Sequence, residues 1–184
     1  MKQVKRVAFS AAVAAVLLVN RVEAQQPSAS TQNENVMITA KIDSTDEAQV
    51  RRLTENFVTA FHNKDLDLMM SLFAPGFVGY DIVPPLQDIG ADTYRKVWAG
   101  TFAFFKNSIE FETRDQHIVT GTDVAFSYFL LRLKTEMGNG IKVDRWQRMT
   151  FGFNKINGKW LITHEHVSVP VDFSTGKAVV DIVP

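Results

Sequence analysis

The sequence predicts an α+β domain in which helices come first and a mostly antiparallel sheet follows. Apolar residues recur every three or four positions from Val50 to Phe61, which indicates a helix with one buried face. After Asn107 the chain changes to alternating or β-branched segments separated by short turns, the pattern of consecutive strands. A run of helices followed by a run of strands is typical of the α+β class.

We expect three helices. The first should start near Asp43, because Ser44 and Glu47 match a capping box. The tripeptide Asn63-Lys64-Asp65 should end this helix and cap a second one, which stops before Pro75-Gly76. The third helix fits residues 91–105.

Four long strands are expected at residues 108–119, 124–135, 142–154 and 159–169, with a short edge strand at residues 77–82. The pairs Asn139-Gly140 and Asn157-Gly158 are strong hairpin signals, because both central positions of a tight turn of this kind require a positive φ.

The N-terminal residues have the three-part pattern of a signal peptide. Residues 1–6 are basic, residues 7–19 form an apolar run, and Ala24 ends a small-x-small cleavage site. The run is shorter than the roughly 20 residues that span a bilayer. We therefore expect a signal peptide at 1–24, a flexible tether at 25–42 and a folded domain at 43–184, in a protein exported to the periplasm or secreted.

The composition excludes several classes of function. The chain has 184 residues with 20 basic and 20 acidic ones, and cleavage would remove four of the former and one of the latter, leaving a net charge of −3. Nucleic acid is not an expected partner, because phosphate contacts need a clustered basic face. There is no cysteine, hence no disulfide or thiolate. No nucleotide fingerprint is visible, and we expect no cofactor.

Several segments, in this order and spacing, resemble the SnoaL-like and ketosteroid-isomerase-like branch of the nuclear-transport-factor-2-like superfamily. The resemblance covers residues 45–173 and rests on residues 63–67, 72–74, 77–81, 90–94, 158–162 and 164–168. It implies a cone-shaped barrel, in which a curved, mostly antiparallel sheet wraps around the three N-terminal helices. Because this fold hosts many reactions, the resemblance does not imply one activity.

The resemblance places the general base of the isomerases at Asp81. It also places Phe57 where the isomerases have the tyrosine of their oxyanion hole, and Met149 where they have a protonated aspartic acid. Neither side chain can donate a hydrogen bond. In the related epoxide hydrolases the last catalytic acid corresponds to Glu165, but their Arg-x-Asp pair is absent here.

A candidate pocket follows from this alignment and from the alternation of side chains along a strand. The inward residues of the third long strand are Arg145, Gln147, Met149 and Phe151, and the alignment turns Leu161, Thr163, Glu165 and Val167 of the last strand inward. With Phe57, Phe61 and Trp98 they would line an apolar cavity with a few polar groups, the usual form of a small-molecule site. Two alternatives are structural: an Arg145–Glu165 ion pair, and an Asp81 carboxylate that only accepts backbone N–H groups.

The outer face of the sheet predicts a partner rather than a metal. His164 and His166 form an H-x-H pair, but no carboxylate completes a ligand set on that face, so we expect no metal. Trp146, Trp160 and Ile162 would form an apolar set too large to stay exposed, which predicts a homodimer.

Three functions remain open from the sequence. The first is an exported module that binds an apolar small molecule of unknown identity. The second is a proton-transfer enzyme, isomerase-like or hydrolase-like, with Asp81 as base. The third is a structural homodimer with a vestigial pocket.

Overall fold

The computed structural model describes residues 29–106 and 109–184, and it confirms the α+β class. The helices are α1 (Ala29–Asn63), α2 (Leu66–Ser71) and α3 (Ala91–Phe104). The long strands are β3 (Glu110–Thr120), β4 (Val124–Glu136), β5 (Lys142–Ile156) and β6 (Lys159–Ser168). The short strands are β1 (Phe73–Tyr80), β2 (Asp88–Ile89), β7 (Val171–Asp172) and β8 (Lys177–Ala178).

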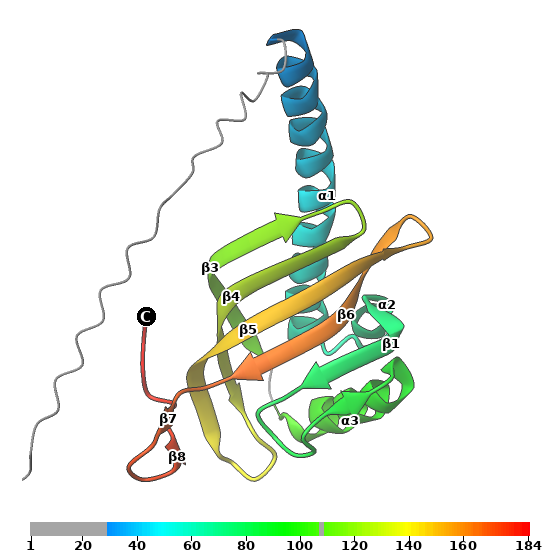
Figure 1. The fold of residues 1–184 in the computed structure, drawn as a ribbon. Helices are drawn as coiled ribbons and strands as arrows, with labels where there is room; N and C mark the ends of the chain where they lie inside the picture. Colours follow the sequence, from blue (N-terminus) through cyan, green and yellow to red (C-terminus); the bar gives the residue numbers. More distant parts are fainter. Residues whose placement is uncertain (1–28, 107–108) are drawn as a thin grey trace, which may run out of the picture.

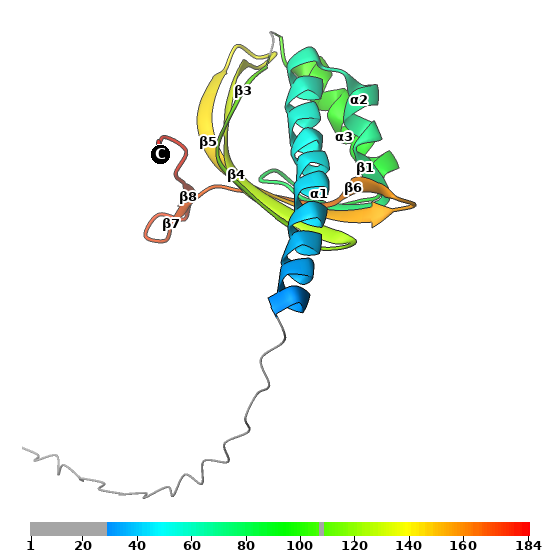
Figure 2. The ribbon, with the colours of Figure 1, turned by 90° about the horizontal axis from the view of Figure 1, so that it is seen from above.

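One six-stranded sheet forms the frame of the domain, with the order β2-β1-β6-β5-β4-β3. All neighbours are antiparallel except β1 and β6, which are parallel. The sheet is strongly curved, and the three helices lie on its concave side (Figures 1 and 2). β7 and β8 form a separate small hairpin. This arrangement is the cone that the resemblance implied.

Helix α1 starts earlier than the sequence pattern predicts. It begins at Ala29, so Ser44 lies inside the helix and is not its N-cap, and residues 29–42, expected as part of a tether, are helical. No glycine or proline interrupts the chain between Ala29 and Asn63, and extending an existing helix costs little compared with starting one. The predicted signal peptide and the first residues of the predicted tether lie outside the described residues.

Most other element boundaries follow the predicted turns, but α2 ends at Ser71 and β1 begins at Phe73, before the predicted stop at Pro75-Gly76, and Asn139 lacks the positive φ expected of it. Asp65 caps α2 by accepting a hydrogen bond from the Leu68 backbone N–H at 2.9 Å. Asn157 and Gly158 join β5 to β6 with φ values of 51° and 79°, as a tight turn with positive φ at both positions requires. Among the described residues, no helix has the length and apolar character needed to cross a membrane.

A β-bulge in β6 changes which of its side chains face the helices. Gly152 pairs with His164 while Phe153 pairs with Ile162, so Thr163 is an extra residue with no opposite residue in the β5–β6 ladder. Trp160 and Ile162 before the bulge are 2% and 0% exposed, and Glu165 and Val167 after it are also buried. The prediction that Leu161 and Thr163 face inward is wrong, because it assumed an unbroken alternation.

Helix α1 is fastened to the sheet by a buried carboxylate. Asp46 accepts hydrogen bonds from the Trp160 indole N–H at 2.9 Å and from Lys155 Nζ at 2.7 Å. The hydrogen bond from the Lys155 ammonium group has the largest effect and that from the Trp160 indole the next, and both lower the pKa of the Asp46 carboxyl group. The link holds the helix against β5 and β6 at the point where the bulge turns Trp160 inward.

Replacing Asp46 with alanine should destabilise the protein by about 2 kcal/mol, because the buried Trp160 indole N–H then has no acceptor. Urea unfolding followed by circular dichroism measures this change. Glu55→Ala, at an exposed position of the same helix, is the matched control and should change stability by less than about 0.5 kcal/mol. Equal stability of the two variants would contradict the structural role of Asp46.

Candidate functional site

A cavity of about 640 Å³ lies between the helices and the curved sheet. Its walls come from α1, α3, the loop after β1, and the inner faces of β3, β4, β5 and β6. Figure 2 shows why these segments meet, since the ends of β3, β4 and β5 curl toward α1 and α3. The volume lies within the range of ordinary small-molecule sites.

All eight candidate site residues proposed from the sequence lie in the wall of this one cavity. They are Phe57, Phe61, Asp81, Trp98, Arg145, Gln147, Met149 and Glu165. The rings pack edge to face, with the Phe61 centroid 4.4 Å from that of Trp98 and 4.9 Å from that of Phe57. The structure thus brings these residues together around one cavity.

Asp81 stands where β1 ends and combines both interpretations given to it. Its Oδ1 accepts the Ile82 backbone N–H at 2.5 Å, as an aspartate near a turn does. The same residue lines the cavity, and burial raises the pKa of its carboxyl group against the opposing effect of the backbone N–H groups of Ile82 and Val83. Tyr80 points the other way, and its ring lies against His164 and His166.

Arg145 and Glu165 do not form the ion pair considered as a structural alternative. No ion pair among the described residues joins them. Glu165 pairs with Phe151 across the ladder, whereas Arg145 lies six residues away along β5, opposite Leu133. Burial lowers the pKa of the half-buried Arg145, whose Nε has no hydrogen-bond partner among the described residues.

Glu165 is the most deeply buried ionisable group of the cavity wall. Only 2% of the residue is exposed, and its Oε2 has no hydrogen-bond partner among the described residues. Burial first, and then the negative charge of Asp81, raise the pKa of Glu165 to about 8, despite an opposing effect of the Tyr94 hydroxyl. A carboxyl group with this pKa is mostly protonated at pH 7, so it can donate a hydrogen bond.

Tyr94 is a residue of the site region that the sequence analysis did not single out. It is 1% exposed on α3, and burial first, then the charge of Glu165, raise its pKa. The α3 residues Lys96, Val97, Gly100, Thr101 and Phe104, which line the cavity, were also missed. The spacing of Val97, Thr101 and Phe104 at three and four residues could have indicated this cavity-facing stripe.

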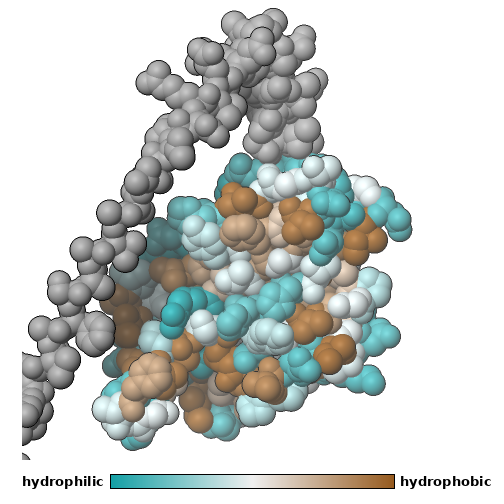
Figure 3. All heavy atoms as spheres, viewed as in Figure 1, coloured by the Kyte–Doolittle hydropathy of each residue, from teal (hydrophilic) through white to brown (hydrophobic). Residues whose placement is uncertain are grey.

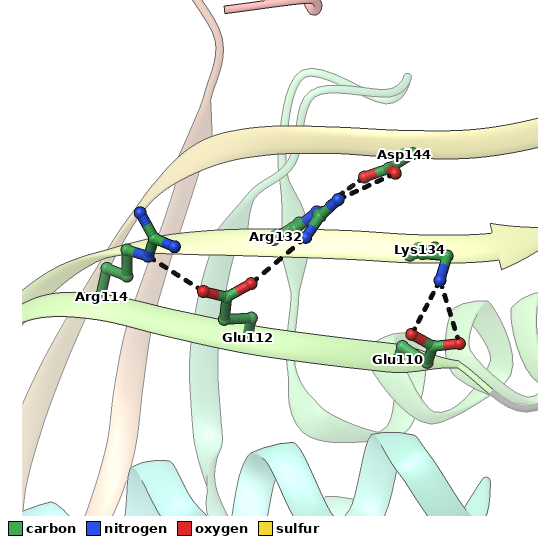
Figure 4. Close-up of polar contacts among 6 residues, drawn as sticks. All are labelled: Glu110, Glu112, Arg114, Arg132, Lys134 and Asp144. Atoms are coloured by element: carbon green, nitrogen blue, oxygen red, sulfur yellow. Dashed lines mark hydrogen bonds and ion pairs between the residues drawn. The ribbon is translucent and has the colours of Figure 1, made fainter. Parts of the chain in front are cut away.

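The outer face of β3, β4 and β5 is polar at one end and apolar at the other. At the polar end Arg132 binds Asp144 through two hydrogen bonds of 2.8 and 3.0 Å, and ion pairs join the neighbouring strands (Figure 4). At the other end Val119, Phe126 and Tyr128 are 45–50% exposed. Apolar patches on the side seen in Figure 1 are separated by polar residues (Figure 3).

The outer face therefore differs from the predicted one. Trp160 and Ile162 are buried on the helix side of the sheet, so they cannot form an apolar surface with Trp146. His164 Nδ1 lies 2.8 Å from the Val78 carbonyl oxygen, and the described residues contain no cluster of three potential metal ligands.

The fold and the cavity define a cone-shaped α+β protein of the nuclear-transport-factor-2-like kind. A profile of the SnoaL-like domain matches residues 50–172, and the chain belongs to this family. No curated protein matches the sequence.

Solved structures with the same fold are numerous. An NTF2-like protein of unknown function from Pseudomonas putida KT2440 is 26% identical, with a TM-score of 0.70 over 77% of this chain and 98% of that one. A candidate dehydratase of the NTF2-like family from Streptomyces avermitilis is 19% identical, with a TM-score of 0.62 over 70% and 99% of the two chains. A ketosteroid isomerase-like protein from Erwinia carotovora atroseptica is 18% identical, with a TM-score of 0.58 over 66% and 93%.

The raised pKa of Glu165 predicts that stability falls as pH rises. The folded state retains the proton up to about pH 8, whereas the unfolded chain loses it near 4.5. The folded state therefore binds more protons between these values, and each pH unit across this window costs up to about 1.4 kcal/mol of unfolding free energy. Glu165→Gln, which cannot ionise, should flatten this slope.

Urea unfolding of both proteins at several values between pH 5 and pH 8 measures the effect. Glu110→Gln, which removes an exposed carboxylate, is the control and should keep the wild-type slope. Parallel pH profiles for the wild type and Glu165→Gln would show that the Glu165 carboxyl is not protonated in the folded protein.

Proposed function

We propose that this protein is an exported SnoaL-like module that binds an apolar small molecule in the cavity between helices and sheet. The observation that carries the proposal is the cavity itself, because about 640 Å³ is lined mainly by aromatic and aliphatic side chains with six polar residues among them. Burying apolar ligand surface supplies the free energy of binding, and a few polar groups orient the ligand.

Two further parts of the proposal concern location and assembly. Export rests on the three-part pattern of residues 1–24 and predicts a mature N-terminus near Gln25, which the mass of the secreted protein would test. A homodimer remains a proposal on a different basis, the exposed Val119, Phe126 and Tyr128 at one end of the outer face. Light scattering of a Phe126→Glu variant beside the wild type would test it.

Gly100 offers a way to block the cavity without disturbing the core. It is an exposed residue of the cavity wall, and a Cβ built there meets no atom within 4 Å. Gly100→Trp should place an indole at the rim and weaken binding of 2-ethylnaphthalene, a hydrocarbon probe, at least about tenfold because it removes space for apolar contact. Isothermal titration calorimetry measures the affinity.

Gly100→Ala is the matched control. It should bind the hydrocarbon like the wild type and be more stable by up to about 1 kcal/mol, because alanine favours a helix over glycine. Equal binding by the wild type and both variants, or no binding by any of them, would count against this cavity as the ligand site.

A second candidate function is proton transfer with Asp81 as general base. It is favoured by the position of the Asp81 carboxyl in the cavity wall, where burial raises its pKa toward the working range of a base. Phe57 and Met149 supply no donor for the negative oxygen that such a reaction creates, and each missing donor costs about 100-fold or more in rate.

We therefore expect slow exchange of the α-protons of 2-acetylnaphthalene in heavy water, measured by NMR, and faster exchange in Phe57→Tyr because the new hydroxyl is a donor. Adding Asp81→Asn should remove both the original exchange and the gain. Asp67→Asn, an exposed position on α2, is the control for a lost carboxylate. A gain that survives the loss of the Asp81 carboxyl would place the base elsewhere.

A further inference from the structure

Most of the buried polar groups in the cavity wall that lack a partner are donors. The Trp98 indole N–H and the Arg145 Nε–H have no hydrogen-bond partner among the described residues, and neither do Gln147 Oε1 and Glu165 Oε2. All four residues line the cavity, whereas Tyr94, whose hydroxyl acts on Glu165, lies behind the wall. With Glu165 protonated, Gln147 Oε1 is the one acceptor of this set and the other three groups are donors. Buried polar groups rarely stay unpaired, so the set indicates that a ligand supplies an acceptor.

The surroundings of Glu165 disfavour its charged form. The two cations of the cavity wall do not pair with it: Arg145 makes no ion pair with Glu165 among the described contacts, and Lys96 of α3 is exposed. The groups that act on it are the carboxylates of Asp81 and Asp88, both of the same sign, and the hydroxyl of Tyr94. A carboxyl group in this position keeps its proton and becomes a donor.

The charges of the cavity also select the ligand. Arg145 acts electrostatically on Asp81, so this half-buried cation already has a counter-charge inside the site. A ligand carboxylate would approach Arg145 against the repulsion of Asp81. An uncharged carbonyl oxygen meets no such repulsion and can accept from Glu165 and from Trp98.

We propose that Glu165 is a neutral hydrogen-bond donor to the ligand, and that the cavity selects apolar molecules carrying an uncharged carbonyl group over the corresponding carboxylates. The inference deepens the proposed function and depends on it. The Glu165 carboxyl group on β6 would also be a hydrogen-bond donor in a cavity where Phe57 and Met149 supply none. Glu165 thereby becomes a specificity-determining residue of the site.

Three probes of similar shape test this: 2-acetylnaphthalene, 2-ethylnaphthalene and 2-naphthoate. At pH 7 the ketone should bind the wild type at least about threefold more tightly than the hydrocarbon, the usual effect of one neutral hydrogen bond, and the naphthoate should bind most weakly. Glu165→Gln keeps an N–H donor and should retain the preference for the ketone. Glu165→Leu should lose that preference and bind the hydrocarbon at least as well as before.

The infrared stretch of a ¹³C-labelled ketone carbonyl reports the hydrogen bond itself. It should shift to lower wavenumber in the wild type and in Glu165→Gln relative to Glu165→Leu. Ketone affinity should also fall above about pH 8 in the wild type, where Glu165 ionises, and not in Glu165→Gln. Glu110→Gln should behave as the wild type, and circular dichroism checks that each variant is folded.

Two results would overturn the inference. If the ketone and the hydrocarbon bind equally to all proteins, Glu165 donates nothing, although the cavity still binds apolar molecules. If the naphthoate binds most tightly and Arg145→Met abolishes its binding, the site selects anions. Failure of every probe, the hydrocarbon included, would instead remove the proposed function.

Discussion

The site depends on one extra residue in the last long strand. If β6 alternated without interruption, Trp160 and Ile162 would lie on the opposite face from Glu165 and Val167. The bulge at Thr163 lets both pairs face the helices, so the strand contributes core residues before it and cavity residues after it. Asp46 fixes the first part through the Trp160 indole, and the second part places Glu165 in the cavity wall.

Periodic sequence patterns and turn residues predicted the helices and strands, whereas the bulge in β6 and the true start of α1 were not predicted. Helical spacing in α1 and the turn at Asn157-Gly158 depend on local chemistry, which a single sequence displays. On β6 itself no glycine or proline marks the bulge at Thr163, and Gly152 lies opposite it on β5. The early start of α1 was missed because a capping box at Ser44 is a local preference, which a continuing helix overrides.

The candidate site was also predictable in part. The resemblance placed Asp81, Arg145, Gln147, Met149 and Glu165 at one cavity because it assigns each of these residues a position in the complete fold. It could not show that Arg145 and Glu165 stay apart, since that depends on how far β5 extends beyond the end of β6. Nor could it show that Tyr94 lies behind Glu165, because these two residues are brought together by tertiary packing and not by their spacing along the chain.

The two sides of the cavity are held by different kinds of bonds. The sheet side consists of strands fixed by a continuous backbone ladder, whereas α3, which contributes Val97, Thr101 and Phe104 among others, lies outside that ladder. A shift of α3 that accommodates a changed side chain breaks no interstrand hydrogen bond. Natural selection could therefore reshape the helical wall for a new ligand while the strands, with their polar groups, stay in place. Divergence among relatives that share this cone but differ in ligand should concentrate on that helix.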